Sequence, residues 1–164
     1  MSRIASAQRE VAAPPDTLFA YLADLEQHWQ LADRFIEVVR IERPADGGPA
    51  RGGVVRMRGP LGIRRTARTN VVGAEPPARL SGVAHVGSGT IARVSWTLHP
   101  AGAGTGVRLE ATVEHASLLD RALLALGGRR WLERRFGTIL ETLERRIGAA
   151  APRRSVGIVQ SGSE

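Results

Sequence analysis

The sequence predicts an α+β domain: a curved antiparallel sheet of seven strands, two short helices and one long C-terminal helix. One observation is a series of short runs in which apolar and polar residues alternate, which is typical of strands with one buried face. The other is a set of apolar residues that share one helical face, namely Leu132, Phe136, Ile139, Leu140, Leu143 and Ile147. A sheet with one long helix against its concave side tends to enclose a hollow, and a hollow indicates a small apolar ligand.

The first elements are a strand and two short helices. Residues 4–11 alternate as a strand does, and a helix follows over residues 18–23. Pro14-Pro15 suits the entry to that helix, and Asp16 is expected to cap its exposed N–H groups. A second short helix is expected over residues 25–31.

Six further strands follow along the chain. They are expected at residues 35–43, 54–58, 63–72, 80–86, 90–98 and 107–115. Residues 59–62 are expected to form a tight hairpin turn, and residues 44–49 and 100–106 to form loops, because these segments are rich in glycine and proline. Strands joined by such short connections pair antiparallel.

Two apolar stripes in the C-terminal third lie on different helical faces. The first consists of Leu119, Leu123 and Leu126, and the second is the six-residue stripe given above. At about 100° per residue the two cannot lie on one side of a straight helix. Gly127-Gly128 separates them, and paired glycines readily break a helix. We therefore expect a short helix over residues 117–126 and a long one over residues 129–147.

The composition predicts one domain over residues 1–147, followed by a disordered tail over residues 148–164. Hydrophobic residues make up 43% of the 164-residue chain, which is enough for a core. There is no cysteine, so disulfide and thiolate chemistry are excluded. The N-terminus lacks the apolar stretch of a signal peptide, and no apolar run has the length of a membrane span, so we predict a cytoplasmic protein.

The charge pattern leaves a binding partner open. The net charge is +7 and all 23 basic residues are arginine, which points to the codon usage of a GC-rich genome more than to phosphate contacts. No nucleic-acid recognition motif is present, so nucleic-acid binding is disfavoured. Four arginines share the outward side of adjacent strands, namely Arg56, Arg58, Arg64 and Arg68. A solvated sheet face is the favoured interpretation, and a basic patch for a membrane, nucleic acid or acidic protein is the alternative.

The alternation also predicts which residues face the hollow. The candidate cavity residues are Met57, Arg65, Ala67, Thr69, Ala84, Val94, Trp96, Ala111, Val113, Leu132, Phe136 and Leu140. Several inward residues are small, which leaves volume, although Trp96, Met57 and Phe136 could instead fill it. Arg65 is a polar exception, and a buried guanidinium is costly unless it is paired. Arg65 therefore either reaches the solvent at the rim or meets a carboxylate of the protein or of an amphiphilic ligand.

Several of these features together resemble one known family. They are residues 13–19 leading into residues 22–24, the nearby Trp29, the strand at residues 94–98, Pro100, residues 104–107 and the terminal amphipathic helix. The pattern resembles the polyketide cyclase/dehydrase-like branch of the START/Bet v 1-like (SRPBCC) superfamily over residues 2–147. The resemblance implies a helix-grip fold, in which the last helix grips a seven-stranded sheet. That superfamily includes lipid and sterol carriers, aromatase/cyclases, ubiquinone-binding proteins and hormone receptors, and it supplies no shared catalytic residue.

No catalytic or metal-binding motif is evident. There is no Gly-x-Ser-x-Gly elbow, phosphate loop or dinucleotide pattern, and the four histidines are scattered, so no metal or cofactor is predicted. Candidates for a proton donor or acceptor are His28, Tyr21, Arg65 and His115. The leucine-rich residues 118–126 are a candidate lid hinged at Gly127-Gly128, although a packed helix that never moves is slightly favoured.

The prediction is a protein that binds a lipophilic small molecule between the sheet and the C-terminal helix. An aromatase/cyclase or dehydratase acting on a polyketide-like substrate is the alternative, and an interaction protein that uses its arginine face is a third. Whether a reaction is catalysed, which ligand binds and which oligomer forms all stay open.

Overall fold

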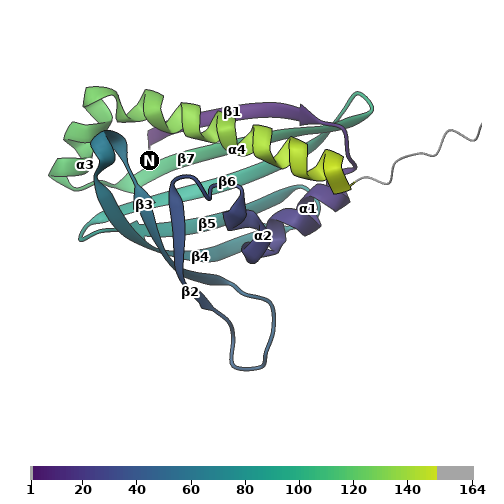
Figure 1. Cartoon of the computed structure of the whole chain (residues 1–164), viewed down its shortest axis with the longest axis horizontal. Helices are drawn as coiled ribbons and strands as arrows, with labels where there is room; N and C mark the ends of the chain where they lie inside the picture. The colour runs from purple at the N-terminus through teal and green to yellow at the C-terminus, as the bar shows by residue number, and fades with distance from the viewer. Residues whose placement is uncertain (1, 151–164) are drawn as a thin grey trace, which may run out of the picture.

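A computed structural model describes residues 2–150 and shows a seven-stranded sheet crossed by one long helix (Figure 1). The strands are β1 (Ser2–Val11), β2 (Ile36–Glu42), β3 (Gly52–Arg58), β4 (Arg64–Glu75), β5 (Arg79–Val86), β6 (Thr90–Ala101) and β7 (Gly104–His115). The helices are α1 (Pro15–Ala23), α2 (Leu25–Gln30), α3 (Leu118–Leu123) and α4 (Arg129–Ala150), with a 3-10 turn η1 (Pro60–Gly62) and a π-helical turn η2 (Leu124–Gly128).

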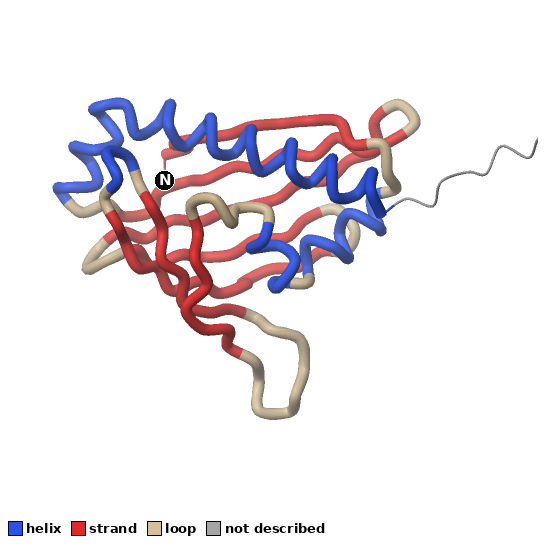
Figure 2. Tube along the Cα trace, viewed as in Figure 1, coloured by secondary structure: helices blue, strands red, loops and turns tan. Residues whose placement is uncertain are grey.

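The sheet is antiparallel throughout, with the order β1-β7-β6-β5-β4-β3-β2. Because β1 pairs with β7 at one edge, the N-terminal strand lies beside the last strand of the chain. The helices lie on one face of this sheet, and α4 runs along its β1 and β7 side (Figure 2). This is the predicted α+β architecture, with a long C-terminal helix and short helices between β1 and β2.

The prediction of a loop over residues 100–106 is wrong. β6 and β7 continue to Ala101 and Gly104, which pair with each other and leave a two-residue turn. Gly104 is needed for close packing, since a Cβ there would lie 2.3 Å from the Val11 carbonyl oxygen on β1. The buried Thr105 hydroxyl also donates a 2.6 Å hydrogen bond to the Ala13 carbonyl oxygen. These small residues therefore serve strand pairing and not a loop.

Two helix ends differ from expectation. Asp16 does not cap α1: the N-cap residue is Pro14, which has no capping side chain, and Asp16 lies within the first turn. Asp24 caps α2 instead, since its side chain accepts hydrogen bonds from the N–H groups of Glu26 and Gln27. Residues 148–150, expected in a disordered tail, continue α4, whereas residues 151–164 of that tail lie outside the described residues.

The predicted break in the C-terminal third is confirmed. Gly127 has a φ of 109°, a conformation that residues other than glycine rarely adopt. The chain therefore turns between η2 and α4, and the two apolar stripes differ in burial: Leu119 and Leu126 are exposed, whereas the stripe on α4 is largely buried. On α4 the buried residues are Phe136, Ile139, Leu140, Leu143 and Ile147, all members of the predicted stripe.

Candidate ligand-binding cavity

A cavity of about 340 Å³ lies between the sheet and the helices. Its volume falls within the roughly 300–1,000 Å³ typical of small-molecule sites. The side chains that line it are predominantly apolar and come from all seven strands, α2, η1, α3, η2 and the first part of α4. The cavity is therefore chemically suited to an apolar guest.

Small side chains on the sheet leave this space open. The smallest lining residues on β5, β6 and β7 are Gly82, Ala84, Ala92 and Ala111. Towards the α1 end of the sheet, larger side chains from α1, α4 and the sheet fill the same layer, namely Leu18, Leu22, Leu98, Val107, Leu143 and Ile147. The hollow thus lies where the sheet is lined with alanine and glycine and where α1 does not reach.

Ten of the twelve predicted cavity residues line the cavity. They are Met57, Arg65, Thr69, Ala84, Val94, Trp96, Ala111, Val113, Leu132 and Phe136. The two that do not are fully packed: Ala67 lies in a cluster with Leu25 and Trp29 of α2, and Leu140 lies in the main core. That any of the ten contacts a ligand stays a prediction.

Other lining residues come from segments that strand alternation does not reveal. The main ones are Leu25, His28, Trp29, Pro60, Leu123, Leu124 and Trp131. They belong to α2, to the turns and to the α3–α4 region, whose positions over the sheet depend on tertiary packing. The apolar face of α2 was the one signal in the sequence that could have located its part of the wall.

Arg65 is paired within the protein. Its guanidinium forms an ion pair with Asp120 of α3, and the Arg65 and Asp120 side chains are 20% and 15% exposed. The hydroxyls of Thr90 and Ser117 also donate to the Asp120 carboxylate. The sequence left open whether Arg65 reaches the solvent or meets a carboxylate of the protein or of a ligand. In the structure Arg65 meets a carboxylate of the protein, and this residue lies 55 positions away in the chain.

These contacts favour the charged form of Asp120. Burial alone would raise the pKa of this carboxyl, but the hydrogen bonds from Thr90, Ser117 and Arg65 and the positive charge of Arg65 outweigh burial and lower the pKa. Asp120 and Arg65 therefore form a neutral pair that ties α3 to β4 at one end of the cavity.

His28 adds a titratable side chain to another part of the cavity wall. Its Nδ1 lies 2.8 Å from the Leu22 carbonyl oxygen and donates to it, which leaves Nε2 as an acceptor in the neutral ring. Burial lowers the pKa of His28, and the hydrogen bond to Leu22 offsets this effect only in part. The ring is therefore neutral at pH 7. The ring stands edge-on to Trp96, with centroids 5.3 Å apart.

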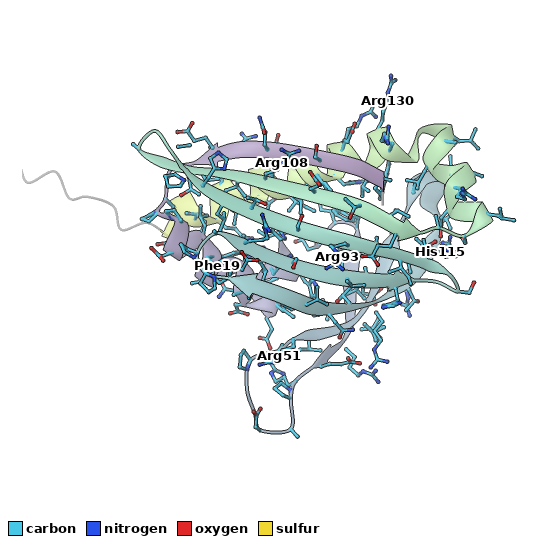
Figure 3. All side chains as sticks on the ribbon, turned by 180° about the vertical axis from the view of Figure 1, so that it is seen from behind. Phe19, Arg51, Arg93, Arg108, His115 and Arg130 are labelled. Carbon is cyan, nitrogen blue, oxygen red and sulfur yellow. The ribbon has the colours of Figure 1, made fainter. Side chains whose placement is uncertain are left out.

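The other two acid–base candidates lie outside the cavity. The Tyr21 hydroxyl is buried without a hydrogen-bond partner among residues 2–150, but Tyr21 is not a lining residue. His115 is exposed at the end of β7, as Figure 3 shows from behind the sheet. Of the four candidates, only His28 and Arg65 line the cavity.

His28 and the Arg65–Asp120 pair lie at opposite ends of the cavity. Thr90, which contacts Asp120, and Trp96, which contacts His28, both belong to β6 and are six residues apart. At about 3.3 Å per residue they are separated by roughly 20 Å. The wall between them is formed by Ala92 and Val94 on this strand.

The outward arginines divide into two pairs. Arg56 contacts Glu37 at 3.3 Å, and Arg68 contacts Glu42 at 3.1 Å, a carboxylate that Arg40 also contacts, so both arginines have an acidic partner on the sheet surface. Arg58 and Arg64 face each other across β3 and β4, and neither has an acidic partner among residues 2–150.

The sheet, the gripping helix and the cavity define a START-like helix-grip protein. The chain belongs to the family described as polyketide cyclase / dehydrase and lipid transport, whose model matches residues 3–148. Membership agrees with the resemblance found in the sequence. No curated protein matches the chain.

Solved structures share the fold at low identity. TTHA0849 from Thermus thermophilus is 22% identical with a TM-score of 0.67, and the match covers 90% of this chain and 98% of that one. A START superfamily protein from Mycobacterium smegmatis is 18% identical with a TM-score of 0.64, covering 92% of this chain and 100% of that one. DynU16, from the dynemicin biosynthetic locus, is 20% identical with a TM-score of 0.54, covering 90% of this chain and 48% of that one.

Within residues 2–150, no helix combines the length and apolar character needed to cross a membrane.

Proposed function

We propose that the chain binds one lipophilic small molecule in the cavity between the sheet and α4. The observation that carries this proposal is the cavity itself, with its volume of about 340 Å³ and its predominantly apolar wall. Water gains few hydrogen bonds in such a space, so an apolar guest that replaces it is favoured. The family description, which names both cyclase/dehydrase and lipid transport, is consistent with a lipophilic ligand. A cytoplasmic location stays a prediction.

The ends of the cavity suggest the chemistry of the ligand. Since the charge of Arg65 is already neutralised by Asp120, an anionic head group would have to compete with this carboxylate. A neutral ligand avoids that competition. A hydroxyl at the other end could donate to His28 Nε2. We therefore propose an elongated, uncharged ligand with an apolar body and a hydroxyl group at the His28 end.

The expected affinity follows from the buried area. Burial of about 300 Å² of apolar ligand surface contributes on the order of 7 kcal/mol. Association costs at least about 4 kcal/mol, so apolar contact alone gives weak, roughly millimolar binding. A hydrogen bond at the polar end, or a larger apolar body, is required to reach the micromolar range.

An apolar fluorescent probe tests the proposal. The probe should bind and be displaced by a lipid extract, and Ala84→Trp should abolish binding because the indole occupies the cavity. Ala74→Trp is the matched control, since Ala74 is exposed on β4 and does not line the cavity. Equal probe binding by wild type and Ala84→Trp would place the probe elsewhere and overturn the proposal.

A cyclase or dehydratase is the second candidate, and one observation favours it. Such chemistry needs a proton acceptor beside the bound substrate, and His28 supplies a neutral imidazole in the cavity wall. For an enzyme, His28→Gln should lose turnover of an aromatic polyketone while it still binds the apolar probe. Failure of the wild type to alter such polyketones would count against this candidate and leave the binding proposal intact.

A further inference from the structure

Four leucines are exposed at one end of the molecule. Leu61 of η1 is 88% exposed, and three leucines of the α3–η2 segment follow: Leu118 at 82%, Leu126 at 82% and Leu119 at 52%. Single exposed apolar residues are common on proteins, but several large ones gathered together mark an interaction site.

Packing brings the two segments together. A Cβ on Gly128 at the end of η2 would lie 3.6 Å from the Pro60 side chain of η1. Pro60, Leu123 and Leu124 also line the same end of the cavity. In Figure 1 the turn between β3 and β4 accordingly lies beside α3.

Four exposed arginines lie around these leucines. Arg58 and Arg64 flank η1 from opposite strands, and Arg121 and Arg130 lie in the helical segments; all four are exposed without an acidic partner among residues 2–150. Arg130 projects away from the ribbon in Figure 3. From residue 116 to residue 132 the one acidic side chain is Asp120, which Arg65 neutralises.

We define the tip surface as Leu61, Leu118, Leu119 and Leu126 together with Arg58, Arg64, Arg121 and Arg130. We propose that the tip surface docks on an anionic lipid bilayer. Leucine side chains can enter the boundary between head groups and acyl chains, while adjacent arginines contact the phosphate and carboxylate groups of the lipids. Leucines combined with unpaired arginines suit an anionic bilayer because it has an apolar acyl region directly beneath negatively charged head groups.

Other partners fit the tip surface less well. In a symmetric dimer formed through this surface, the unpaired arginines of two copies would approach one another and repel. Nucleic acid would offer phosphate groups to the arginines but would not bury the exposed leucines. Docking on a bilayer does not require an occupied cavity, so this inference can fail or succeed independently of the proposed ligand. If both hold, docking sets the α3 end of the cavity against the bilayer.

Vesicle co-sedimentation of the full chain tests the inference. Vesicles made from equal parts of phosphatidylcholine and phosphatidylserine should sediment the protein, whereas vesicles of phosphatidylcholine alone should sediment much less. In a Leu61→Ser/Leu118→Ser/Leu126→Ser variant the partition coefficient should fall by about tenfold per leucine. In Arg58→Gln/Arg64→Gln it should fall by about fivefold per arginine.

Matched variants separate the tip surface from general stickiness of a basic protein. Val39→Ser/Val72→Ser removes two other exposed apolar side chains, which are 51% and 52% exposed, and Arg34→Gln/Arg51→Gln removes two other exposed arginines. These controls should bind vesicles as the wild type does. Circular dichroism should show the same folded spectrum for every variant, because all the replaced side chains are exposed.

Three outcomes would overturn the inference. One is that the wild type does not sediment with the anionic vesicles. Another is that the control variants lose binding as much as the tip variants do. A third is a wild-type dimer in sedimentation velocity that the leucine variant alone abolishes, which would assign the tip surface to a second copy of the chain.

Discussion

Removal of the Asp120 carboxylate tests how α3 is held over the cavity. Asp120→Ala deletes the acceptor for Arg65, Thr90 and Ser117 and leaves the Arg65 guanidinium without its counter-charge. Breaking a fully buried ion pair costs roughly 3–5 kcal/mol. Because the Arg65 and Asp120 side chains are 20% and 15% exposed, water recovers part of that loss, and we expect about 2–3 kcal/mol.

The loss should appear as a lower melting temperature. For a chain of this size each kcal/mol shifts Tm by about 2–4 °C, so Asp120→Ala should melt about 4–12 °C below the wild type at pH 7. The difference should shrink in acid. Since the pKa of Asp120 is lowered by folding, its stabilisation is present above the unfolded-state pKa of about 4 and is lost as the pH falls through the lower folded-state pKa.

A double variant separates the pair from simple packing. Arg65→Met combined with Asp120→Leu removes both charges, and we expect it to be more stable than Asp120→Ala because no unpaired charge is left behind. The assay is calorimetric melting of all three proteins. A melting temperature for Asp120→Ala within about 1 °C of the wild type at pH 7 would refute the view that this pair fixes α3.

Three further changes have defined outcomes. Gly53→Ala should prevent folding or cost several kcal/mol, since its Cβ would lie 2.3 Å from the Arg40 carbonyl oxygen; soluble yield and circular dichroism check this, and native-like stability would contradict the packing. In Gly127→Ala the new Cβ would have no neighbour within 4 Å, but alanine would have to adopt a φ of 109°. We therefore expect the free energy of unfolding, measured in urea, to fall by about 1 kcal/mol. An increase in this free energy would show that η2 does not need the conformation. His28→Gln should reduce the loss of stability that the wild type shows as the pH falls below about 6.5, because a buried neutral histidine must be protonated on unfolding; identical profiles would place His28 in water.

The strands and the helix break were predictable because they rest on local patterns. Alternation fixes which side chains share a face, so Ala84, Val94 and Trp96 could be assigned to the cavity side from the sequence. The break at Gly127-Gly128 could be predicted because two apolar stripes in the sequence lie on different helical faces. Both signals act over a few residues and need no knowledge of distant contacts.

The remaining features depend on contacts between distant parts of the chain. The partner of Arg65 lies 55 residues away on a helix whose position over the sheet is set by tertiary packing. Ala67 has the predicted orientation, but α2 covers it, which alternation cannot reveal. Gly104 and Gly106 suggested a loop because close packing, here against Val11 of β1 and His99 of β6, and a flexible turn favour the same residue type.

The division of the arginine face also required the structure. Alternation along the strands predicted that Arg56, Arg58, Arg64 and Arg68 lie together on the outward face of the sheet. In the structure, Glu37 and Glu42 of the strand β2 form ion pairs with Arg56 and Arg68, and Glu42 is shared with Arg40. The unpaired arginines are therefore those closest to η1, where the exposed Leu61 lies.

Native mass spectrometry of the protein purified from its own host tests the central claim most directly. We expect one non-covalent adduct per chain, with the mass of a lipophilic molecule, that is lost under collisional activation and absent from Ala84→Trp but present in Ala74→Trp. A wild-type spectrum with the unliganded mass alone, before and after incubation with a lipid extract, would contradict the account.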